Sequence, residues 1–452
     1  MNMTNTTHHQ RDTIIMGMGK TGLACIHFLV KHKKSLHVMD NRPTPPGLKT
    51  LNQTFPDIPY TTGYFDATQL AQAAEIIISP GLSRQEPALA QALAKGVPVI
   101  SEIELFARHV NAPVVAITGS NGKSTVTTLL GEMAKKAGWR VQVGGNLGTP
   151  TLELLCNPAP DLYLLELSSF QLESTYSLNP KAAVILNISE DHQDRYANIE
   201  EYIAAKKRIY HGDGKMIINI DDPHVNAMLL TYPHRQYLTF SLSHHSGNFR
   251  IHPHQGELYL THVNQSFTPL LPITQLKGSL MPANALAALA LGEAVGLPQS
   301  AMLDALQTFR GLQHRCAWVD NKQDIDFIND SKGTNVGATI AAISSLKKKI
   351  ILIAGGEGKG ADFTPLKNVV AQHCRACVLI GRDAQLIADV LTDVVPVHYA
   401  KSMADAVTEA ATLAHPNDAV LLSPACASFD QFDNYEHRGQ VFEEAVKQVM
   451  DN

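Results

Sequence analysis

The chain has 452 residues, of which 44% are hydrophobic and 17% are charged, and its formal net charge is -5. This length is too great for one compact core, and the weak net charge and the lack of any apolar run of about 20 residues lead us to expect neither a nucleic-acid partner nor membrane insertion. Six scattered cysteines and an N-terminal segment without an apolar core favour a cytoplasmic protein without a signal peptide.

The first expected unit is a Rossmann-like domain over residues 1–103. Its strand-like runs lie in DTIIMGMGKTG, SLHVMD, AEIIISPG and GVPVI. Residues 17–22, GMGKTG, match G-x-G-x-x-G, and Asp40 closes the next strand, where the ribose-binding acid of an NAD enzyme belongs. The motif alone leaves three interpretations open: NAD, another nucleotide whose phosphate binds the helix N-terminus, or a turn needed only for packing.

The second expected unit, residues 104–311, is a phosphate-loop domain with a mostly parallel sheet. The apolar runs RVQVGGN, DLYLLELSS, KAAVILNIS and GKMIINIDD each end in small or polar residues, which is typical of parallel strands with functional loops at their carboxyl ends. Alternating stretches between residues 236 and 268 indicate an antiparallel patch, and NALAALALGEAVG predicts a helix.

The stretch VVAITGSNGKSTVTTLL, residues 114–130, predicts a strand, a phosphate-binding loop and a helix. Only two residues separate Gly119 from Gly122, whereas the common pattern has four residues between its glycines. The glycines allow backbone N–H groups to converge on phosphate oxygens, Lys123 supplies a positive charge, and Ser124 or Thr125 can offer a hydroxyl to Mg²⁺. The alternative is a glycine turn followed by a solvated lysine.

Three further positions in this unit are candidates for metal chemistry. Glu166 ends a buried strand, and His192 follows another strand in NISEDHQDRY, so both can reach a metal at the carboxyl edge of the sheet. The alternatives are a helix cap or surface acid for Glu166 and a structural histidine for His192. Lys206, in EYIAAKKRIY, by itself indicates a basic, solvated helix face.

The third expected unit, residues 312–452, is again a Rossmann-like α/β domain. The loops NDSKGTN and GGEGKGAD each follow an apolar strand and offer a lysine with backbone N–H donors, which suits a carboxylate or phosphate ligand. SPACASFDQFDNYEHRG combines small residues with aromatic ones and suits a ligand pocket, with helix packing as the alternative.

These motifs resemble, in order and over nearly the whole chain, those of the Mur ligases, in which the short loop T-G-x-N-G-K-[ST] is usual. The motifs that carry the resemblance are GMGKTG, GSNGKST, ELSSFQLE, EDHQDRY, AAKKRIY, His314-Arg315, NDSKGTN, GGEGKGAD and SPACASFDQF. The family often has His and Asn where this chain has Leu280 and Met281, whereas Asn284 of the same motif is present.

The resemblance implies an ATP-dependent amide ligase of peptidoglycan assembly. ATP would phosphorylate the alanyl carboxylate of UDP-N-acetylmuramoyl-L-alanine, and the amine of D-glutamate would displace phosphate. The D-N-P-R sequence of the diaminopimelate-adding relative is absent, which favours glutamate. The resemblance further implies two Mg²⁺ ions, ATP as co-substrate, small-molecule partners only and a monomeric, cytoplasmic enzyme.

The resemblance also assigns roles to individual positions. It implies that catalysis depends on Lys123, Glu166, His192, Lys206 and Lys332. ATP would contact Gly119, Ser120, Asn121, Gly122, Lys123, Ser124, Thr125, Asn284, Arg315 and Asp330. The metal ligands would be Ser124, Glu166, His192 and Lys206, the last as a carbamate formed with CO₂. The UDP substrate would contact Lys20, Thr21, Asn41, Arg42, Ser79, Gly81 and Asn146, and D-glutamate would contact Thr334, Lys359, Ser428, Phe429 and Tyr435.

Three other classes fit parts of the sequence. Folylpolyglutamate synthetase shares the two later domains but lacks a full nucleotide-like domain ahead of the phosphate loop. An NAD-dependent dehydrogenase or sensor would explain GMGKTG but not the phosphate loop, Glu166 or Lys206. A phosphate-loop switch would hydrolyse ATP without any amino acid.

Overall fold

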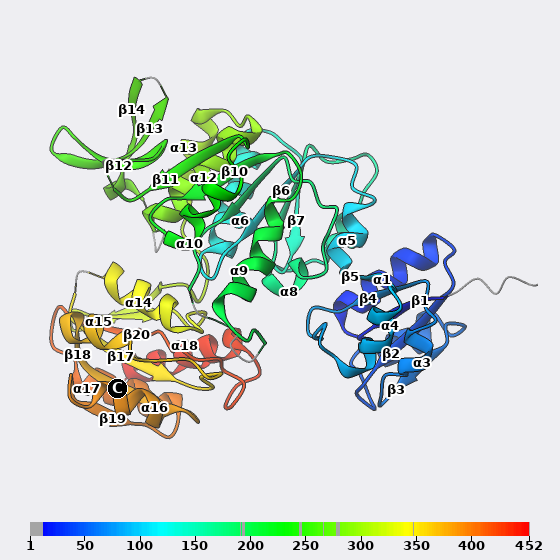
Figure 1. The fold of residues 1–452 in the computed structure, drawn as a ribbon. Helices are drawn as coiled ribbons and strands as arrows, with labels where there is room; N and C mark the ends of the chain where they lie inside the picture. The colour runs from blue at the N-terminus through cyan, green and yellow to red at the C-terminus, as the bar shows by residue number, and fades with distance from the viewer. Residues whose placement is uncertain are drawn as a thin grey trace, which may run out of the picture.

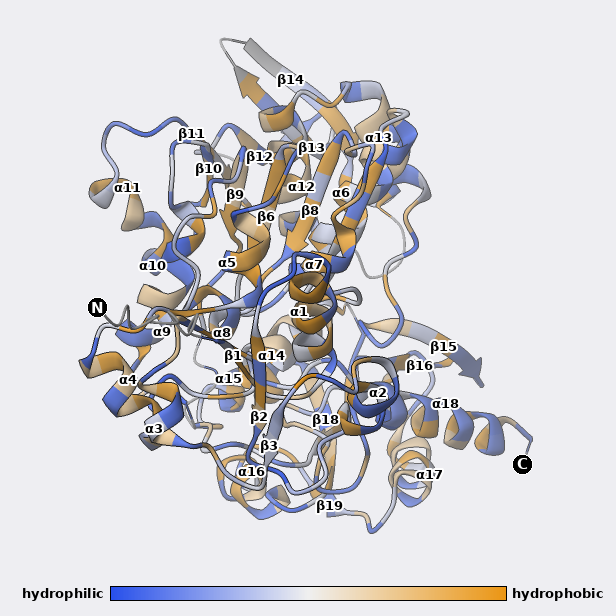
Figure 2. Ribbon diagram, turned by 90° about the vertical axis from the view of Figure 1, so that its right-hand side faces the viewer, coloured by the Kyte–Doolittle hydropathy of each residue, from blue (hydrophilic) through white to orange (hydrophobic). Residues whose placement is uncertain are grey.

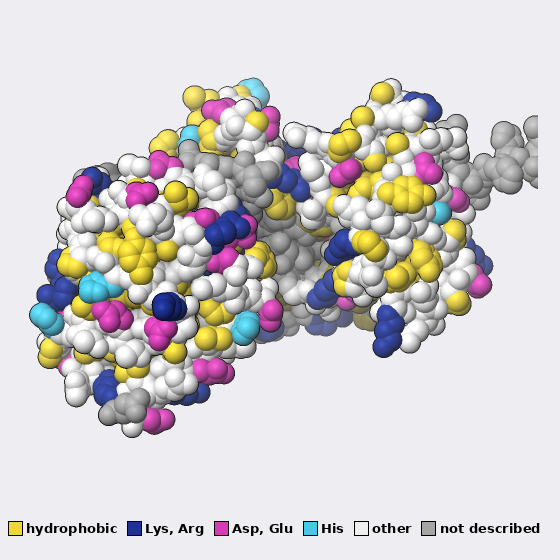
Figure 3. Space-filling model, turned by 90° about the horizontal axis from the view of Figure 1, so that it is seen from below, with side chains coloured by type: hydrophobic (Ala, Val, Ile, Leu, Met, Phe, Trp, Pro, Cys, Tyr) yellow, Lys and Arg dark blue, Asp and Glu magenta, His cyan; other side chains and the backbone are white. Residues whose placement is uncertain are grey.

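The computed structural model describes residues 12–189, 191, 195–243, 246–264, 266–276, 281–346 and 348–451. Three sheets follow one another along the chain, and helices cover their faces (Figure 1). The central unit lies between two outer units, and the outer units are separated by a hollow when the molecule is seen from below (Figure 3). Within the described ranges, none of the helices has both the length and the apolar character needed to cross a membrane.

The N-terminal unit is a five-stranded parallel sheet in the order β3-β2-β1-β4-β5. Its strands are β1 (Thr13–Met16), β2 (Leu36–Asp40), β3 (Tyr60–Thr62), β4 (Glu75–Ile78) and β5 (Val99–Ile100). Its helices are α1 (Lys20–Lys31), α2 (Leu48–Thr54), α3 (Ala67–Leu70), the 3₁₀ turn η1 (Pro87–Leu89) and α4 (Ala90–Ala94). The central strand β1 is almost fully buried, so it reads as a continuous apolar run in the sequence.

The central unit has nine strands in the order β14-β13-β12-β11-β10-β9-β6-β8-β7. They are β6 (Val114–Thr118), β7 (Val141–Gly145), β8 (Leu162–Glu166), β9 (Ala182–Ile185), β10 (Lys215–Asn219), β11 (Tyr237–Ser241), β12 (Phe249–His254), β13 (Glu257–Asn264) and β14 (Ser266–Pro272). Hydrophobic residues run along the neighbouring strands β6 and β8, which are buried over their whole length (Figure 2). The antiparallel patch expected between residues 236 and 268 is present in β12–β14, but β11 pairs in parallel with both neighbours.

Helices pack on both faces of the central sheet. They are α6 (Lys123–Lys136), α7 (Thr151–Leu154), α8 (Ser169–Leu172), α9 (Ile199–Lys207), the 3₁₀ turn η2 (Arg208–Tyr210), α10 (Pro223–Asn226), α11 (Met228–Thr231), the 3₁₀ turn η3 (Ile273–Gln275), α12 (Pro282–Val295) and α13 (Gln299–Thr308). The alanine- and leucine-rich helix predicted from NALAALALGEAVG is α12, and it is buried over most of its length. Together with α6 it forms the core on one face of the sheet.

The C-terminal unit has six strands in the order β15-β16-β20-β17-β18-β19, and only the edge pair β15–β16 is antiparallel. The strands are β15 (Ala317–Lys322), β16 (Ile325–Asn329), β17 (Ile350–Gly355), β18 (Cys374–Ile380), β19 (Val397–Tyr399) and β20 (Ala419–Leu422). The helices are α14 (Val336–Ser345), α15 (Leu366–His373), α16 (Ala384–Leu391), α17 (Met403–Leu413) and α18 (Tyr435–Asp451). The α/β architecture with mostly parallel sheets is therefore as predicted.

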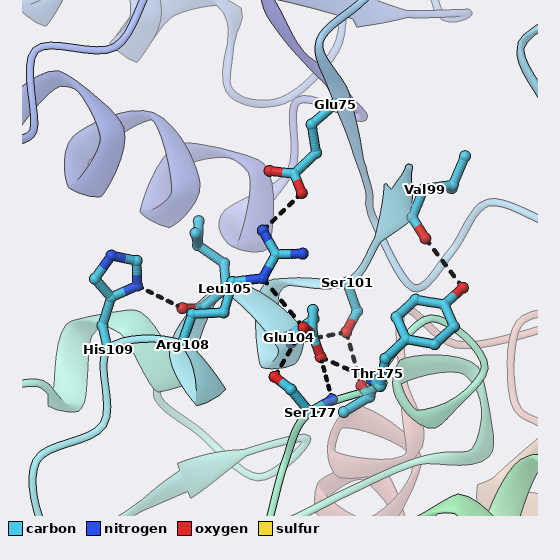
Figure 4. Close-up of polar contacts among 10 residues, drawn as sticks. Glu75, Val99, Ser101, Glu104, Leu105, Arg108, His109, Thr175 and Ser177 are labelled. Atoms are coloured by element: carbon cyan, nitrogen blue, oxygen red, sulfur yellow. Dashed lines mark hydrogen bonds and ion pairs between the residues drawn. The ribbon is translucent and has the colours of Figure 1, made fainter. Parts of the chain in front are cut away.

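The helix α5 (Glu102–Ala107) joins the first two units, so the division predicted between residues 103 and 104 falls inside it. Glu104 accepts hydrogen bonds from the backbone N–H groups of Tyr176 (2.7 Å) and Ser177 (2.8 Å). Arg108 donates to Glu104 at 3.1 Å and to Glu75 at 2.6 Å (Figure 4). Burial alone would raise the pKa of Glu104, but these hydrogen bonds bring it below its ordinary value. One charged cluster thus connects the N-terminal and central units.

Candidate active site

The phosphate loop lies between β6 and α6, at the carboxyl edge of the central sheet. Gly122 precedes α6 with a φ of 84°, a left-handed conformation that favours glycine. A Cβ atom at Gly122 would lie 2.5 Å from Oδ1 of Asn284, so a side chain from α12 closes against the loop. Asn187 fixes the backbone of the loop at Asn121: its Oδ1 accepts from the N–H of Asn121 (2.8 Å), and its Nδ2 donates to the carbonyl of Asn121 (3.1 Å).

Two lysines, the buried Lys206 and the half-buried Lys123, converge on the carbonyl of Gly119. Lys123 donates to it at 2.8 Å and to the carbonyl of Ser120 at 2.9 Å, and Lys206 donates to it at 2.9 Å. Burial lowers the pKa of both lysines, and the neighbouring Lys123 lowers that of Lys206 further. Lys206 is only 1% exposed, so the interpretation of a basic, solvated helix face is wrong for this residue. The sequence of α9 did not reveal this burial, because it does not show that the helix directs Lys206 toward the phosphate loop.

Glu166 lies beside the loop because β8 pairs with β6, with Ile117 opposite Glu166 in the register. Its Oε1 accepts from Nδ2 of Asn146 at 2.8 Å. Its Oε2 is buried and has no hydrogen-bond partner among the residues that the structure describes. An unpaired buried carboxylate oxygen is costly unless a cation approaches it, so this atom fits a metal ligand.

His192 lies outside the described residues, and the structure does not test its predicted metal role. Within the described part of the chain, His, Cys, Asp and Glu side chains form no group of three or more that could hold a metal ion. The groups there that can serve as metal ligands are Ser124 at the start of α6 and Glu166, with Lys206 nearby if it carries an oxygen-donor adduct.

The C-terminal unit contributes cations to the same loop. Lys332 donates to Oγ of Ser124 at 3.0 Å, and Arg315 donates to the same oxygen at 3.3 Å. Burial and the adjacent Arg315 lower the pKa of Lys332 to about 8. The ammonium of Lys332 lies 4.9 Å from the ring centroid of Tyr435, the first residue of α18. Tyr435 therefore lies beside Lys332, on the side of the C-terminal unit that faces the phosphate loop.

Asp330, predicted to contact ATP, directly follows β16 and is buried. It accepts hydrogen bonds from the hydroxyl of Ser423 (2.7 Å) and the backbone N–H of Cys316 (3.1 Å). Burial raises the pKa of Asp330 to about 6 although these hydrogen bonds oppose the shift. The carboxylate thereby fixes the loop that carries Arg315 relative to the sheet.

A second contact between these units comes from two asparagine side chains. Asn121 and Asn335 exchange hydrogen bonds of 3.2 and 3.3 Å through their amide groups. Asn335 also donates to Asp191 at 3.1 Å, and Lys359 lies 3.8 Å from the other oxygen of Asp191. These polar contacts bring loops of the C-terminal unit against the phosphate loop.

The residues predicted to bind the UDP substrate all line one cavity of about 640 Å³ between the first two units. They are Lys20, Thr21, Asn41, Arg42, Ser79, Gly81 and Asn146. Arg42 pairs with Asp40 through two hydrogen bonds of 2.8 and 2.7 Å, and this pairing helps hold the pKa of Asp40 below its ordinary value against the effect of burial. Asn146 lines this cavity and also donates to Glu166, so one residue links the cavity to the carboxylate beside the phosphate loop.

The residues predicted to bind D-glutamate are only partly brought together. Thr334 and Lys359 line a cavity of about 190 Å³. Ser428 is buried next to a β-bridge that joins Glu357 to Ala427, whereas Phe429 is 71% exposed. Tyr435 lies with Lys332 instead. The five residues therefore lie in three places: two line the cavity, two follow the β-bridge, and Tyr435 lies beside Lys332.

Sequence reasoning missed several residues that position this site. Asn187 and Asn335 are polar residues inside quoted motifs, and their position after a strand was the only available signal. Arg438 was not singled out, yet it is 1% exposed and donates to Ser331 and to the carbonyls of Cys426 and Ala427. It joins two loops about 100 residues apart in sequence, which no local pattern can reveal.

Three α/β units, a phosphate loop in the central unit and cations of the C-terminal unit on that loop define the class of the protein: this is a three-domain α/β phosphate-loop enzyme. Residues 11–101 match the Mur ligase MurD-like N-terminal domain, residues 117–292 the Mur ligase middle domain, and residues 314–426 the Mur ligase glutamate ligase domain. The chain belongs to the Mur ligase family.

Similar proteins extend over nearly the full length. A UDP-N-acetylmuramoylalanine--D-glutamate ligase from Nitrosococcus oceani is 51% identical over 97% of this chain and 97% of its own length. A protein of the same name from Pseudomonas syringae pv. syringae is 50% identical over 97% of this chain and 98% of its own. Among solved structures, a pseudomurein peptide ligase type C from Methanothermus fervidus has a TM-score of 0.60 at 18% identity and covers 97% of this chain and 100% of its own. E. coli FolC, with a TM-score of 0.59 at 17% identity, covers 78% of this chain and 93% of its own. The last two likenesses concern the fold.

Proposed function

We propose that this chain is an ATP-dependent amide ligase that adds D-glutamate to UDP-N-acetylmuramoyl-L-alanine in peptidoglycan synthesis, with release of ADP and phosphate. One observation carries the proposal: Asn146 lines the cavity between the N-terminal and central units and also donates to Glu166 beside the phosphate loop. A substrate in that cavity can therefore present its carboxylate where the γ-phosphate of ATP would lie. The names of relatives about 50% identical to the chain support the choice of substrates.

The reaction requires two steps because oxide is a poor leaving group at neutral pH. The alanyl carboxylate first takes the γ-phosphoryl group of ATP, which forms an acyl phosphate and ADP. The amine of D-glutamate then attacks the acyl carbon, the C–O bond to phosphate breaks, and the ammonium proton passes to a base or to water. Both steps concentrate negative charge, which favours a site with several cations and aligned N–H donors.

In this proposal the residues of the chain have separate tasks. The loop from Gly119 to Thr125 and Asn284 would hold ATP, and Lys123 and Lys332 would neutralise the phosphates as charge moves to the acyl phosphate. Arg315 and Asp330 would complete the ATP site from the C-terminal unit. Thr334, Lys359, Ser428, Phe429 and Tyr435 stay proposed contacts of D-glutamate, and the pocket requires closure of the C-terminal loops to bring them together.

Mg²⁺, with two ions proposed, would shield the phosphate oxygens. Ser124 and Glu166 fit this group because the buried Oε2 of Glu166 has no other partner among the described residues. His192 stays a proposed ligand. Lys206 is buried beside Lys123 with its pKa well below the ordinary value, so its neutral amine can attack CO₂ and lose a proton to give an anionic carbamate. The carbamate oxygens would reverse the local charge at a position where an ammonium would repel metal.

One chain supplies every residue of the proposed site, so we propose a monomer, and a cytoplasmic location follows from the use of ATP and a UDP-linked substrate. The test is phosphate release with ATP, Mg²⁺ and UDP-N-acetylmuramoyl-L-alanine, compared among D-glutamate, L-glutamate and lysine. Release that depends on D-glutamate is expected. Release that is the same without any amino acid would refute the ligase and favour a phosphate-loop switch.

A further inference from the structure

A cavity of about 840 Å³ lies between the N-terminal and central units, and it shares no lining residue with the cavity proposed for the UDP substrate. The N-terminal unit contributes Ser83, Arg84 and Gln85, and the central unit contributes residues from α9, η2 and the segments that follow α8 and α11. Its volume falls in the range of small-molecule sites in proteins, about 300–1,000 Å³. The proposed ligase reaction uses none of these residues.

Positive charge exceeds negative charge in the lining of this cavity. Five of the lining residues are Arg84, Arg195, Lys207, Arg208 and Arg235, against the two carboxylates of Glu173 and Glu201. Both carboxylate oxygens of Glu173 already have partners: one pairs with Arg195 at 2.7 Å, and the other accepts from the hydroxyl of Tyr196. Within the described residues, none of the other four cations forms an ion pair with a carboxylate. Arg208 is exposed and the other four cations are half-buried, and this excess of positive charge in the lining favours an anionic ligand.

Aromatic rings and carbonyl groups fix these cations in place. The guanidinium groups of Arg84 and Arg208 lie 6.0 and 5.0 Å from the ring centroid of Tyr176, so one ring holds a cation from each unit. Lys207 lies 5.3 Å from the ring centroid of Tyr232 and forms no hydrogen bond or ion pair with the described residues. The positions are therefore prepared before any ligand arrives, which reduces the entropy lost on binding.

Arg235 adds an unsatisfied donor to this arrangement. It donates to the carbonyls of Tyr210 (3.0 Å) and Gly214 (2.6 Å), but its Nε is buried and has no hydrogen-bond partner among the described residues. Several guanidinium and ammonium groups with spare donors match phosphate oxygens better than a single carboxylate, since a diphosphate offers more acceptors and more charge.

We propose that this cavity binds a small molecule that carries a diphosphate or triphosphate group, at a site separate from those for ATP and the UDP substrate. Its phosphates contact Arg84 of the N-terminal unit and Lys207 and Arg208 of the central unit. Because the contacts come from both units, occupancy ties the N-terminal unit to the central one. Arg195 also donates to the carbonyl of Pro80 at 3.1 Å, next to Ser79 and Gly81 of the UDP cavity, so the two cavities are adjacent.

The test measures binding of inorganic pyrophosphate to the full chain while UDP and a non-hydrolysable ATP analogue saturate the two other sites. One further pyrophosphate per chain is expected. Its affinity should fall about tenfold or more in Arg84→Gln and in Lys207→Gln, because each substitution removes a charge-assisted contact. The matched controls Lys95→Gln and Lys135→Gln remove the same charge from exposed positions outside the cavity and should leave the affinity unchanged.

Three results would overturn the proposal: no pyrophosphate bound when the other sites are filled, unchanged affinity in Arg84→Gln and Lys207→Gln, or an equal loss in the controls. Binding of the ATP analogue by each variant shows that the chain is folded. Competition then distinguishes the sources of the phosphate group: displacement by GTP at lower concentration than by inorganic triphosphate assigns a nucleotide, and equal displacement assigns a free polyphosphate. Displacement by neither contradicts the proposal.

Discussion

Alanine at Gly122 should weaken ATP binding through one specific clash. Gly122 and Gly138 lie at the two ends of α6, and their φ angles are nearly the same, 84° and 81°. An added Cβ at Gly122 would lie 2.5 Å from Oδ1 of Asn284 and 3.3 Å from Cδ1 of Leu186, whereas one at Gly138 meets nothing within 4 Å. The two positions therefore share the backbone strain and differ in the clash.

Gly122→Ala should therefore cost more stability than Gly138→Ala. Left-handed backbone at a residue with a Cβ costs about 1–2 kcal/mol, so Gly122→Ala and Gly138→Ala should each lower the free energy of unfolding by that amount. Gly122→Ala should cost about 1 kcal/mol more, because the amide of Asn284 must move away from the loop. Displacing this amide should also weaken binding of an ATP analogue about tenfold, while Gly138→Ala should not change it.

Calorimetric titration with the ATP analogue and urea unfolding of both variants provide the measurement. In an Asn284→Ala background, the extra cost of Gly122→Ala should disappear, since the clashing oxygen is gone. Equal loss of nucleotide affinity in Gly122→Ala and Gly138→Ala, or an undiminished cost in the Asn284→Ala background, would refute the reasoning.

The other predictions concern the lysine beside the loop and the junction of the first two units. Lys206→Ala should reduce phosphate release about 100-fold or more, with partial recovery on addition of formate or acetate as substitutes for the carbamate; turnover equal to that of the unchanged chain would remove Lys206 from the site. Glu104→Gln should lower the free energy of unfolding by about 2–3 kcal/mol, because an amide has only one acceptor oxygen: Oε2 accepts from the N–H groups of Tyr176 and Ser177, whereas Oε1 accepts from Arg108 and the hydroxyl of Ser177. An unchanged urea midpoint would contradict this role. Burial raises the pKa of Glu102 from 4.5 to about 7, so its protonated form stabilises the fold fully below pH 4.5, and about 3 kcal/mol of this stability should be lost as the pH rises through 7. Glu102→Gln should remove that pH dependence from urea midpoints measured between pH 5 and 8, and parallel profiles for the two chains would contradict the assignment.

Much of the fold could be read from the sequence because buried parallel strands are continuous apolar runs. β6, β8 and β9 each end in residues that reach the phosphate loop, and the sequence shows both the strand and the polar group that follows it. The short edge strand β3 was missed, since three half-exposed residues produce no apolar run. The parallel pairing of β11 was missed because alternation along a strand does not specify the direction of its neighbours.

The site was less accessible to sequence reasoning than the fold. Lys123 and Glu166 could be placed at the loop from motif and strand position alone. The pairing of Asn121 with Asn335 and the hydrogen bonds of Glu104 with Tyr176 and Ser177 could not, because they join segments more than 70 residues apart and carry no periodic signal. Burial of Lys206 was likewise invisible, since a charged residue on a short helix is ordinarily solvated.

The lysines at the phosphate loop donate hydrogen bonds to neutral oxygens rather than to carboxylates. Lys123 is held by two loop carbonyls and Lys332 by the hydroxyl of Ser124. A polyanion that binds these lysines therefore breaks no ion pair within the protein. It competes only with carbonyl and hydroxyl oxygens, which can then accept hydrogen bonds from water. The hydroxyl of Ser124 accepts from both Lys332 and Arg315, and it becomes available to another ligand when these two cations turn to a phosphate. Binding of the phosphate by Lys332 and release of the Ser124 hydroxyl then occur in the same step.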